Sequence, residues 1–145
     1  MRYFRATDPF PLESAEQNGL HEFYARLAEG RLVTTSCRRC GRVGWPPRPF
    51  CPDCVSDEFS WVELPRDGAV HGFSVQETGL PEGFSAPRVF AIVKVGGARI
   101  FAPIVGAGAS GITVGARVRL APVRVADDAK GEPRYLIAFE PEAMA

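Results

Sequence analysis

The sequence has 145 residues, which is enough for one ordinary domain or two very small ones. Its 17 basic and 17 acidic side chains give a formal net charge of zero, which argues against a protein whose main task is to coat nucleic acid, because such proteins usually carry a basic excess. No stretch approaches the length of a membrane span and residues 1–18 contain no apolar run of the signal-peptide kind, so we expect a cytoplasmic protein with no membrane contact.

After an N-terminal arm without a clear period (residues 1–18), the first predicted element is a helix over residues 19–29. Its apolar side chains recur at positions i, i+3, i+4, i+7 and i+8, which places them on one helical face; they are Leu20, Phe23, Tyr24, Leu27 and Ala28. Asn18 suits the N-cap, and Gly30 suits the position after the C-cap. A helix this short is marginal alone, so its apolar face is expected to dock on the rest of the protein.

Two Cys-x-x-Cys pairs follow, between short predicted strands at 31–36 and 59–64. Two such turns can aim four thiolates at one ion and complete a tetrahedron; the four predicted ligands are Cys37, Cys40, Cys51 and Cys54. In a reducing compartment this spacing indicates a metal site rather than disulfides. We predict a structural zinc ion in a closed site. A rubredoxin-like iron centre for electron transfer is the alternative.

From residue 68 the sequence favours short β-strands, in keeping with its 15 glycines and 13 prolines. Strands are predicted at 69–75, 89–95, 99–104, 117–125 and 134–139. Gly96-Gly97 indicates a hairpin turn between the second and the third. Pro122 shifts the alternation by one residue, which indicates a bulge or bend in the fourth strand. Five short strands suggest a small barrel such as an OB-fold, although strand number alone does not exclude an SH3-like barrel.

Sets of catalytic residues are largely missing. The two histidines, His21 and His71, are expected to be packing or surface residues, and no thiol nucleophile remains if all four cysteines bind metal. The chain has no Gly-x-Ser-x-Gly motif and no Walker phosphate-binding loop. Gly106-Ala107-Gly108 is not followed by the helical pattern that a dinucleotide fingerprint needs. We therefore predict no catalysis by this chain alone.

The segment between residues 31 and 52 contains five arginines and no acidic residue; the arginines are Arg31, Arg38, Arg39, Arg42 and Arg48. One interpretation is that they offset the formal charge of about −2 on a zinc tetrathiolate and otherwise face solvent. The other is an anion site, because a guanidinium group grips phosphate in a fork. Coenzyme A phosphates or a nucleic-acid backbone would both suit it.

Several motifs occur in a specific order: Glu29-Gly30-Arg31-Leu32, Cys37-Arg38-Arg39-Cys40-Gly41, Pro46-Pro47-Arg48-Pro49-Phe50-Cys51-Pro52-Asp53-Cys54, Trp61, and Gly68-Ala69-Val70-His71-Gly72-Phe73-Ser74-Val75. In this order they resemble the acyl-CoA-associated OB-fold/zinc-ribbon proteins, domain-of-unknown-function family 35. The resemblance covers residues 19–140. Two features depart from the family pattern: Val55 stands where a small residue or glycine is common, and Leu64-Pro65-Arg66-Asp67 precedes Gly68.

The resemblance implies a mainly β fold with a short N-terminal helix. The helix and a rubredoxin-like zinc ribbon would occupy residues 19–64, and a five-stranded OB-fold barrel residues 65–145. It also implies a non-catalytic accessory subunit of a thiolase-superfamily enzyme, of the thiolase small-subunit type, in a hetero-oligomer of two plus two chains. Such a subunit helps to bind or channel acyl-CoA. Thiolases use a cysteine nucleophile, which the partner would then supply.

On this interpretation three arginines are candidate contacts for the phosphates of coenzyme A: Arg39, Arg42 and Arg48. Phe84, in the long connection 76–88, is a candidate contact for the partner or the acyl chain, because a loop of that length in a compact domain is often functional. A nucleic-acid-binding module is the alternative function, since OB-folds and zinc ribbons both serve that purpose. Phe73, Phe90 and Phe101 could then stack on bases, unless they belong to the core.

Overall fold

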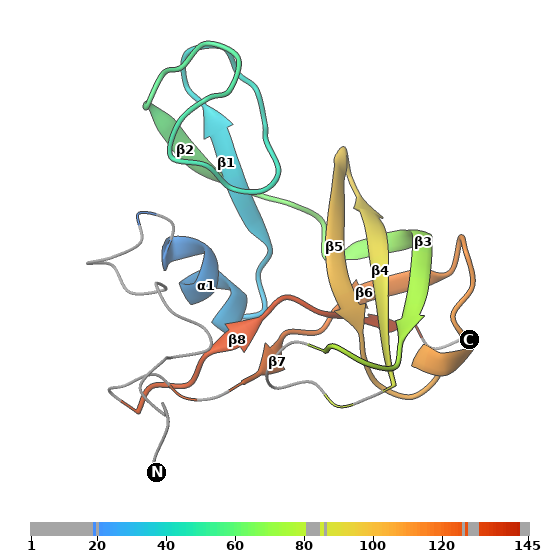
Figure 1. Ribbon diagram of the computed structural model, residues 1–145. Coiled ribbons are helices and arrows are strands. Elements are labelled where there is room, and N and C mark those ends of the chain that lie inside the picture. The colour runs from blue at the N-terminus through green and yellow to red at the C-terminus, as the bar shows by residue number, and fades with distance from the viewer. Residues whose placement is uncertain are drawn as a thin grey trace.

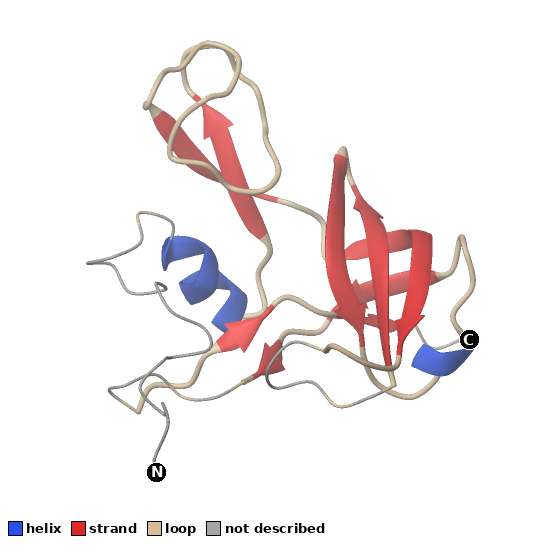
Figure 2. Ribbon diagram, in the orientation of Figure 1, coloured by secondary structure: helices blue, strands red, loops and turns tan. Residues whose placement is uncertain are grey.

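The computed structural model describes residues 19, 21–80, 85, 87–125, 127 and 131–142. A helix and a two-stranded ribbon lie on one side of the molecule and a β-barrel on the other (Figures 1 and 2). The predicted N-terminal arm lies outside the described residues. In the part of the chain that is described, no helix has the length and apolar character needed to span a bilayer.

Helix α1 (His21–Ala28) is one to two residues shorter at each end than the periodicity predicts. Gly30 follows it at φ +77°, a conformation that glycine adopts at little cost and that lets the chain leave the helix. Phe23 and Leu27 are buried, and the Phe23 ring meets the Trp45 ring edge-on with centroids 5.8 Å apart. The apolar face of the helix therefore docks as expected. Its predicted N-cap residue, Asn18, lies outside the described residues.

Strands β1 (Val33–Cys37) and β2 (Phe59–Glu63) pair in antiparallel fashion to form the ribbon. Four of the five residues of β1 are buried, whereas β2 is half-buried. The segment between the two strands carries both cysteine turns. It returns to β1 through a single bridge between Ser36 and Val43.

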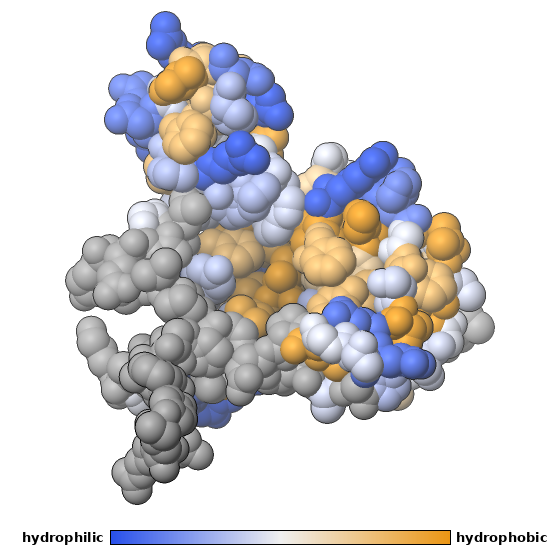
Figure 3. Space-filling model, in the orientation of Figure 1, coloured by the Kyte–Doolittle hydropathy of each residue, from blue (hydrophilic) through white to orange (hydrophobic). Residues whose placement is uncertain are grey.

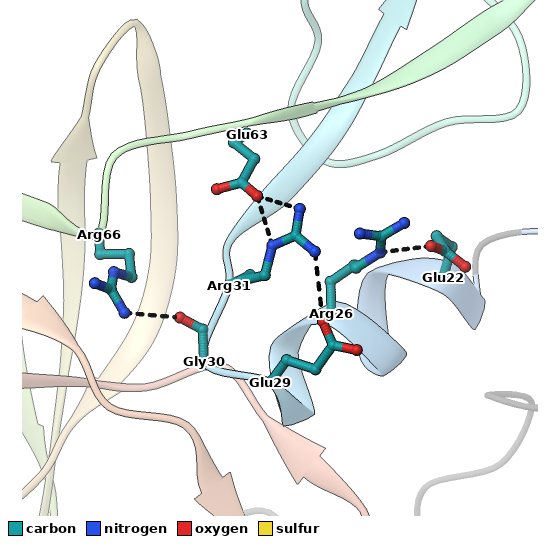
Figure 4. A network of polar contacts seen from close by, with 7 residues as sticks. All are labelled: Glu22, Arg26, Glu29, Gly30, Arg31, Glu63 and Arg66. Atoms are coloured by element: carbon teal, nitrogen blue, oxygen red, sulfur yellow. Dashed lines mark hydrogen bonds and ion pairs between the residues drawn. The ribbon is translucent and has the colours of Figure 1, made fainter.

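Arginine contacts join the helix to the ribbon and to the barrel (Figure 4). Arg31 follows the helix, and its guanidinium group pairs with Glu29 at 3.4 Å and with Glu63 of β2. Arg66 lies in the connection from β2 to the barrel and donates from Nη1 to the carbonyl oxygen of Gly30 at 3.4 Å. These side chains are exposed, so the contacts define the orientation of the helix relative to the ribbon and the barrel more than they add to the folding stability.

Five strands close into a barrel in the order β3-β4-β5-β9-β6, which confirms the predicted five-stranded OB-type architecture. They are β3 (Asp67–Gln76), β4 (Arg88–Val95), β5 (Ala98–Ile104), β6 (Arg117–Leu120) and β9 (Phe139–Pro141). A short 3₁₀ turn, Ala109–Gly111, lies between β5 and β6. Alternate residues of the strands fill the interior; those buried are Val70, Val89, Ala91, Val93, Ile100, Ala102, Ile104, Val118 and Phe139.

The predicted strands at 117–125 and 134–139 are each divided in two, which corrects the prediction. β6 ends at Leu120, and β7 (Val123–Arg124) pairs with β8 (Tyr135–Leu136) in a separate small sheet outside the barrel. Pro122 has no backbone N–H, so the chain cannot continue the ladder there and leaves the barrel. The register shift within the barrel lies instead in β3, between Val70 and Gly72.

Gly68 of β3 is buried against the backbone of β4. A Cβ atom at this position would lie 2.6 Å from the carbonyl oxygen of Lys94 and 2.7 Å from Cγ1 of Val93. We expect Gly68→Ala to lower the free energy of unfolding by about 2 kcal/mol, because the β4 backbone cannot move away without breaking its ladder with β3.

Gly72→Ala in the same strand is the matched control, since no atom lies within 4 Å of the added Cβ. Its effect should be within about 0.5 kcal/mol. Urea unfolding of the two variants measures both values. Equal destabilisation by the two substitutions would contradict the close-approach explanation.

Candidate metal centre

The two Cys-x-x-Cys turns are built with the same backbone hydrogen bonds. In the first, the N–H of Gly41 donates to the carbonyl of Cys37 at 2.9 Å, and the N–H of Cys37 donates to the carbonyl of Arg42 at 2.8 Å. The second turn repeats both bonds, at 2.9 and 2.8 Å, through Val55, Cys51 and Ser56. Each turn thus presents its two sulfur atoms in the same way.

The four sulfur atoms lie within 4.8 Å of one another. Cys37 Sγ is 3.6 Å from Cys54 Sγ, and Cys40 Sγ is 3.5 Å from Cys51 Sγ, so each short contact joins the two turns. Disulfide sulfur atoms are about 2.05 Å apart, which excludes that bond here. A tetrahedral ion with metal–sulfur bonds of about 2.3 Å separates its ligands by about 3.8 Å. The four predicted ligands therefore fit one zinc ion.

The first cysteine of each turn is buried and has a lowered pKa. The N–H of Cys40 donates to Cys37 Sγ at 3.5 Å, and this bond is the main reason that the pKa of Cys37 falls to about 6. The N–H of Cys54 is likewise the main reason that the pKa of Cys51 is lowered. Since a thiolate is the form that binds metal, both positions favour the reactive state.

The second cysteine of each turn has a raised pKa. The N–H of Arg42 lowers the pKa of Cys40, but hydrogen bonding with Cys51, together with desolvation, outweighs it and raises the pKa to about 12. The pKa of Cys54 is raised as well. These two groups must lose their protons when an ion binds, so protons compete with the metal.

The three arginines predicted to bind phosphate differ in their surroundings. Arg42 forms an ion pair with Asp53, which joins the first cysteine turn to the second. Arg39 is exposed and has no ion pair within the described part of the chain. The backbone N–H of Arg48 donates to Thr35 Oγ1 at 2.9 Å, which ties the loop to β1 and leaves the guanidinium group exposed.

A small hollow beside the cysteine turns brings two of these arginines together. Arg42 and Arg48 both line it, along with the aromatic rings of Phe50 and Phe59, whereas Arg39 does not. Phe84, the predicted partner or acyl contact, lies outside the described residues.

Sequence reasoning missed two features of the centre. One is the Arg42–Asp53 ion pair, for which opposite charges in the two turns were the available signal. The other is the left-handed backbone of Val55, which has φ +61° and is the one non-glycine residue of the described part of the chain with positive φ; the available signal was that Val55 stands where the family commonly has a small residue or glycine. Gly41 occupies the equivalent position of the first turn at φ +77°. The left-handed conformation is unfavourable for a β-branched side chain.

We expect the purified protein to contain one zinc ion per chain and to be colourless. Removing the ion with a chelator, or changing Cys54 to Ser, should unfold the ribbon and expose residues 38–58 to proteases, because a two-stranded ribbon is not stable alone. The barrel, which has its own closed ladder, should retain slow amide exchange in β4. Elemental analysis and hydrogen exchange measure these outcomes. Bound iron, or a ribbon that stays protected without metal, would contradict the prediction.

We expect Val55→Gly to raise the free energy of unfolding of the ribbon by about 1 kcal/mol, because the substitution removes the left-handed strain of a β-branched residue. The reciprocal change Gly41→Val introduces that strain at the equivalent position and should destabilise by a similar amount, since no atom lies within 4 Å of the added Cβ. Thermal unfolding of the zinc-bound protein compares the two. A destabilising Val55→Gly would show that side-chain contacts outweigh the backbone strain.

Comparison with known families gives two matches that together follow most of the described chain. "ChsH2, rubredoxin-like zinc ribbon domain" matches residues 25–60, and "ChsH2, C-terminal OB-fold domain" matches residues 61–123. The two matches are adjacent. Their boundary lies within β2, at the end of the ribbon.

Individual relatives agree with this assignment. The DUF35 domain-containing scaffold protein of Methanocaldococcus jannaschii is 33% identical over 115 residues, which cover 76% of this chain and 81% of that protein. The benzoylsuccinyl-CoA thiolase subunit BbsA of Thauera aromatica is 34% identical over 84 residues, which cover 55% of this chain and 58% of that protein. Among solved structures, a chain of the Ltp2-ChsH2(DUF35) aldolase superposes with a TM-score of 0.69 at 28% identity, covering 83% of this chain and 92% of that one. On its sequence, its zinc-ribbon cysteine cluster and its closed barrel, this chain belongs to the DUF35 family of zinc-ribbon and OB-fold proteins.

Proposed function

We propose that this chain is a non-catalytic accessory subunit of a thiolase-type enzyme complex and that it contributes to binding the acyl-CoA. The observation that carries the proposal is that all four cysteines of the chain gather in one site. A tetrathiolate centre has no open position for substrate, and it leaves no sulfur free as a nucleophile. The reactive group of such a complex would then belong to another chain.

The relatives support the choice of partner. One is named as a thiolase subunit, and a solved structure of similar fold is named Ltp2-ChsH2(DUF35) aldolase. We infer a thiolase-fold catalytic subunit as the partner of this chain, in a hetero-oligomer of two plus two chains. Such a complex would work in the cytoplasm, where reducing conditions keep the cysteines available to metal.

Arg39 and Arg48 are the residues that we propose as contacts for the phosphates of coenzyme A. Both guanidinium groups are exposed and have no ion pair within the described ranges, so binding a phosphate would not require a bond to be broken first. Arg42 would have to leave Asp53 before it could make such a contact. Its contribution is therefore expected to be smaller.

The test begins with affinity capture of the tagged chain from its source organism, followed by mass spectrometry and recombinant production of any thiolase-fold chain that co-purifies. We expect the catalytic chain to have little activity alone and to gain activity when this chain is added. A catalytic chain that is fully active alone, and whose affinity for acyl-CoA this chain does not change, would contradict the proposal.

The double variant Arg39→Ala/Arg48→Ala tests the phosphate contacts within that complex. We expect KM for the acyl-CoA to rise roughly tenfold with little change in kcat, because charge-assisted contacts to the carrier act on binding rather than on the reacting bond. Arg117→Ala, which removes an exposed arginine of β6, is the matched control. An unchanged KM would show that these two arginines do not contact the acyl-CoA. The proposed accessory role would not be affected by that result.

A further inference from the structure

The outer face of strands β4 and β5 is apolar in its middle. Ile92 and Phe101 lie directly opposite each other in the ladder, and both point away from the barrel interior, since their neighbours along each strand are buried. Ile92 is 40% exposed and Phe101 66% exposed. The Phe101 ring stacks on that of Phe90, with centroids 5.5 Å apart and planes within 6°. Figure 3 shows apolar side chains gathered over this side of the barrel.

The same face is positively charged at the end nearest the hairpin turn. Lys94 and Arg99 lie directly opposite each other in the row next to Ile92 and Phe101, and both are exposed. Neither has an ion pair within the described part of the chain. The strand alternation places no acidic side chain on the outer side of β4 or β5, whose outward positions hold Arg88, Phe90, Ile92, Lys94, Arg99, Phe101 and Pro103. On the outer side of β3 the acidic residue is Asp67, at the first position of the strand. We call Ile92, Lys94, Arg99 and Phe101 the β4–β5 face.

Both rows of the β4–β5 face are unfavourable for a protein that remains alone in water. Like charges directly opposite each other in an antiparallel pair repel. An aromatic ring left two-thirds exposed beside an exposed aliphatic side chain keeps apolar surface in contact with water. A single feature of either kind is ordinary on protein surfaces. Their occurrence in adjacent rows of one ladder indicates a surface that another molecule covers.

We propose that the β4–β5 face is the surface on which this chain docks its thiolase-fold catalytic subunit, an inference that rests on the proposed function. The complementary surface of the partner is apolar at its centre, to cover Ile92 and Phe101, and carries carboxylates that meet Lys94 and Arg99. Covering the face in this way removes the apolar surface from water and neutralises the paired positive charges. Charge complementarity fixes the kind of partner surface, because the face contributes no acidic group of its own.

A single-stranded nucleic acid is the other occupant to consider, since OB-folds bind oligonucleotides on the face of their second and third strands. Strand binding normally uses several exposed rings in succession. Here Phe90 is only 6% exposed, and Phe73 pairs with the inward-facing Ala91, so it does not share this face. Phe101 is the one well-exposed ring that the described strands place there. The zero net charge of the chain also favours a protein partner.

Two variants of the full-length, zinc-bound chain test the proposal against the recombinant catalytic subunit by biolayer interferometry. Phe101→Ala removes the central side chain, and we expect it to raise Kd tenfold or more. Lys94→Glu/Arg99→Glu reverses both charges and should raise Kd further and reverse its dependence on salt. Because the double reversal keeps a like-charged pair in the ladder, the folding stability should remain close to that of the parent chain.

Matched controls come from residues outside the β4–β5 face. Val114 is also 66% exposed, and Arg117 is an exposed arginine on β6. Val114→Ala and Arg117→Glu should each leave Kd within twofold of the parent value. Thermal unfolding of each variant confirms that a loss of binding does not come from a loss of fold.

The outcomes separate the docking proposal from the accessory role. If the parent chain binds the subunit and all variants bind as tightly as the parent, the β4–β5 face is not the interface, although the accessory role stands. If the parent chain does not bind the subunit at all, the proposed function itself fails, and this inference fails with it. If Phe101→Ala abolishes binding to a single-stranded oligonucleotide and leaves binding to the subunit intact, the nucleic-acid interpretation replaces ours.

Discussion

The attraction of four sulfur atoms to one ion is the interaction on which the ribbon half of the protein depends. Strands β1 and β2 have only five residues each, and two-stranded ribbons of this size are marginal in water. The segment that joins them has almost no regular structure; its single bridge is between Ser36 and Val43. Two backbone turns of the same design bring the sulfur atoms to within 4.8 Å. Everything else on the ribbon, including the hollow lined by Arg42 and Arg48, is placed relative to that cluster.

The ribbon is nevertheless continuous with the barrel, because one buried cluster runs through both. Leu27 of the helix and Leu32 before β1 are fully buried in the same cluster as Val93 of the barrel. The exposed contacts of Arg31 with Glu63 and of Arg66 with Gly30 add polar links between the same parts (Figure 4). A shared core holds the two parts in one orientation more firmly than a flexible linker would. The shared core therefore holds the arginines of the ribbon and the β4–β5 face of the barrel in a fixed spatial relation.

Local chemistry explains which features could be predicted from the sequence. The cysteine spacing, the helical period that ends near Ala28 and the glycine pair before β5 each depend on a few neighbouring residues, so the zinc ribbon, the helix and the hairpin were predictable. The division of the last two predicted strands could not be predicted. The apolar and polar residues around Val123 and Tyr135 alternate in a way that suits a barrel strand as well as a strand of the small separate sheet, and only tertiary pairing decides between the two. The need for glycine at position 68 was also hidden, since the β4 backbone that crowds it is distant in sequence. The exposure of Phe101 could not be predicted either, because the amino-acid type alone predicts a core residue. Whether the side chain is exposed depends on which face of the barrel is covered.

The way in which the barrel closes has a consequence for how the protein is made. Strand β9 inserts between β5 and β6, and it touches β5 through a single parallel pair, Ile104 with Phe139. Phe139 is also among the largest fully buried side chains. During translation, β3 to β6 emerge first and must wait with two open edges until the ribosome has delivered the last few residues of the barrel. Until then the open edges of β5 and β6 can pair with other chains, so the strand order itself creates an aggregation hazard for the nascent sheet.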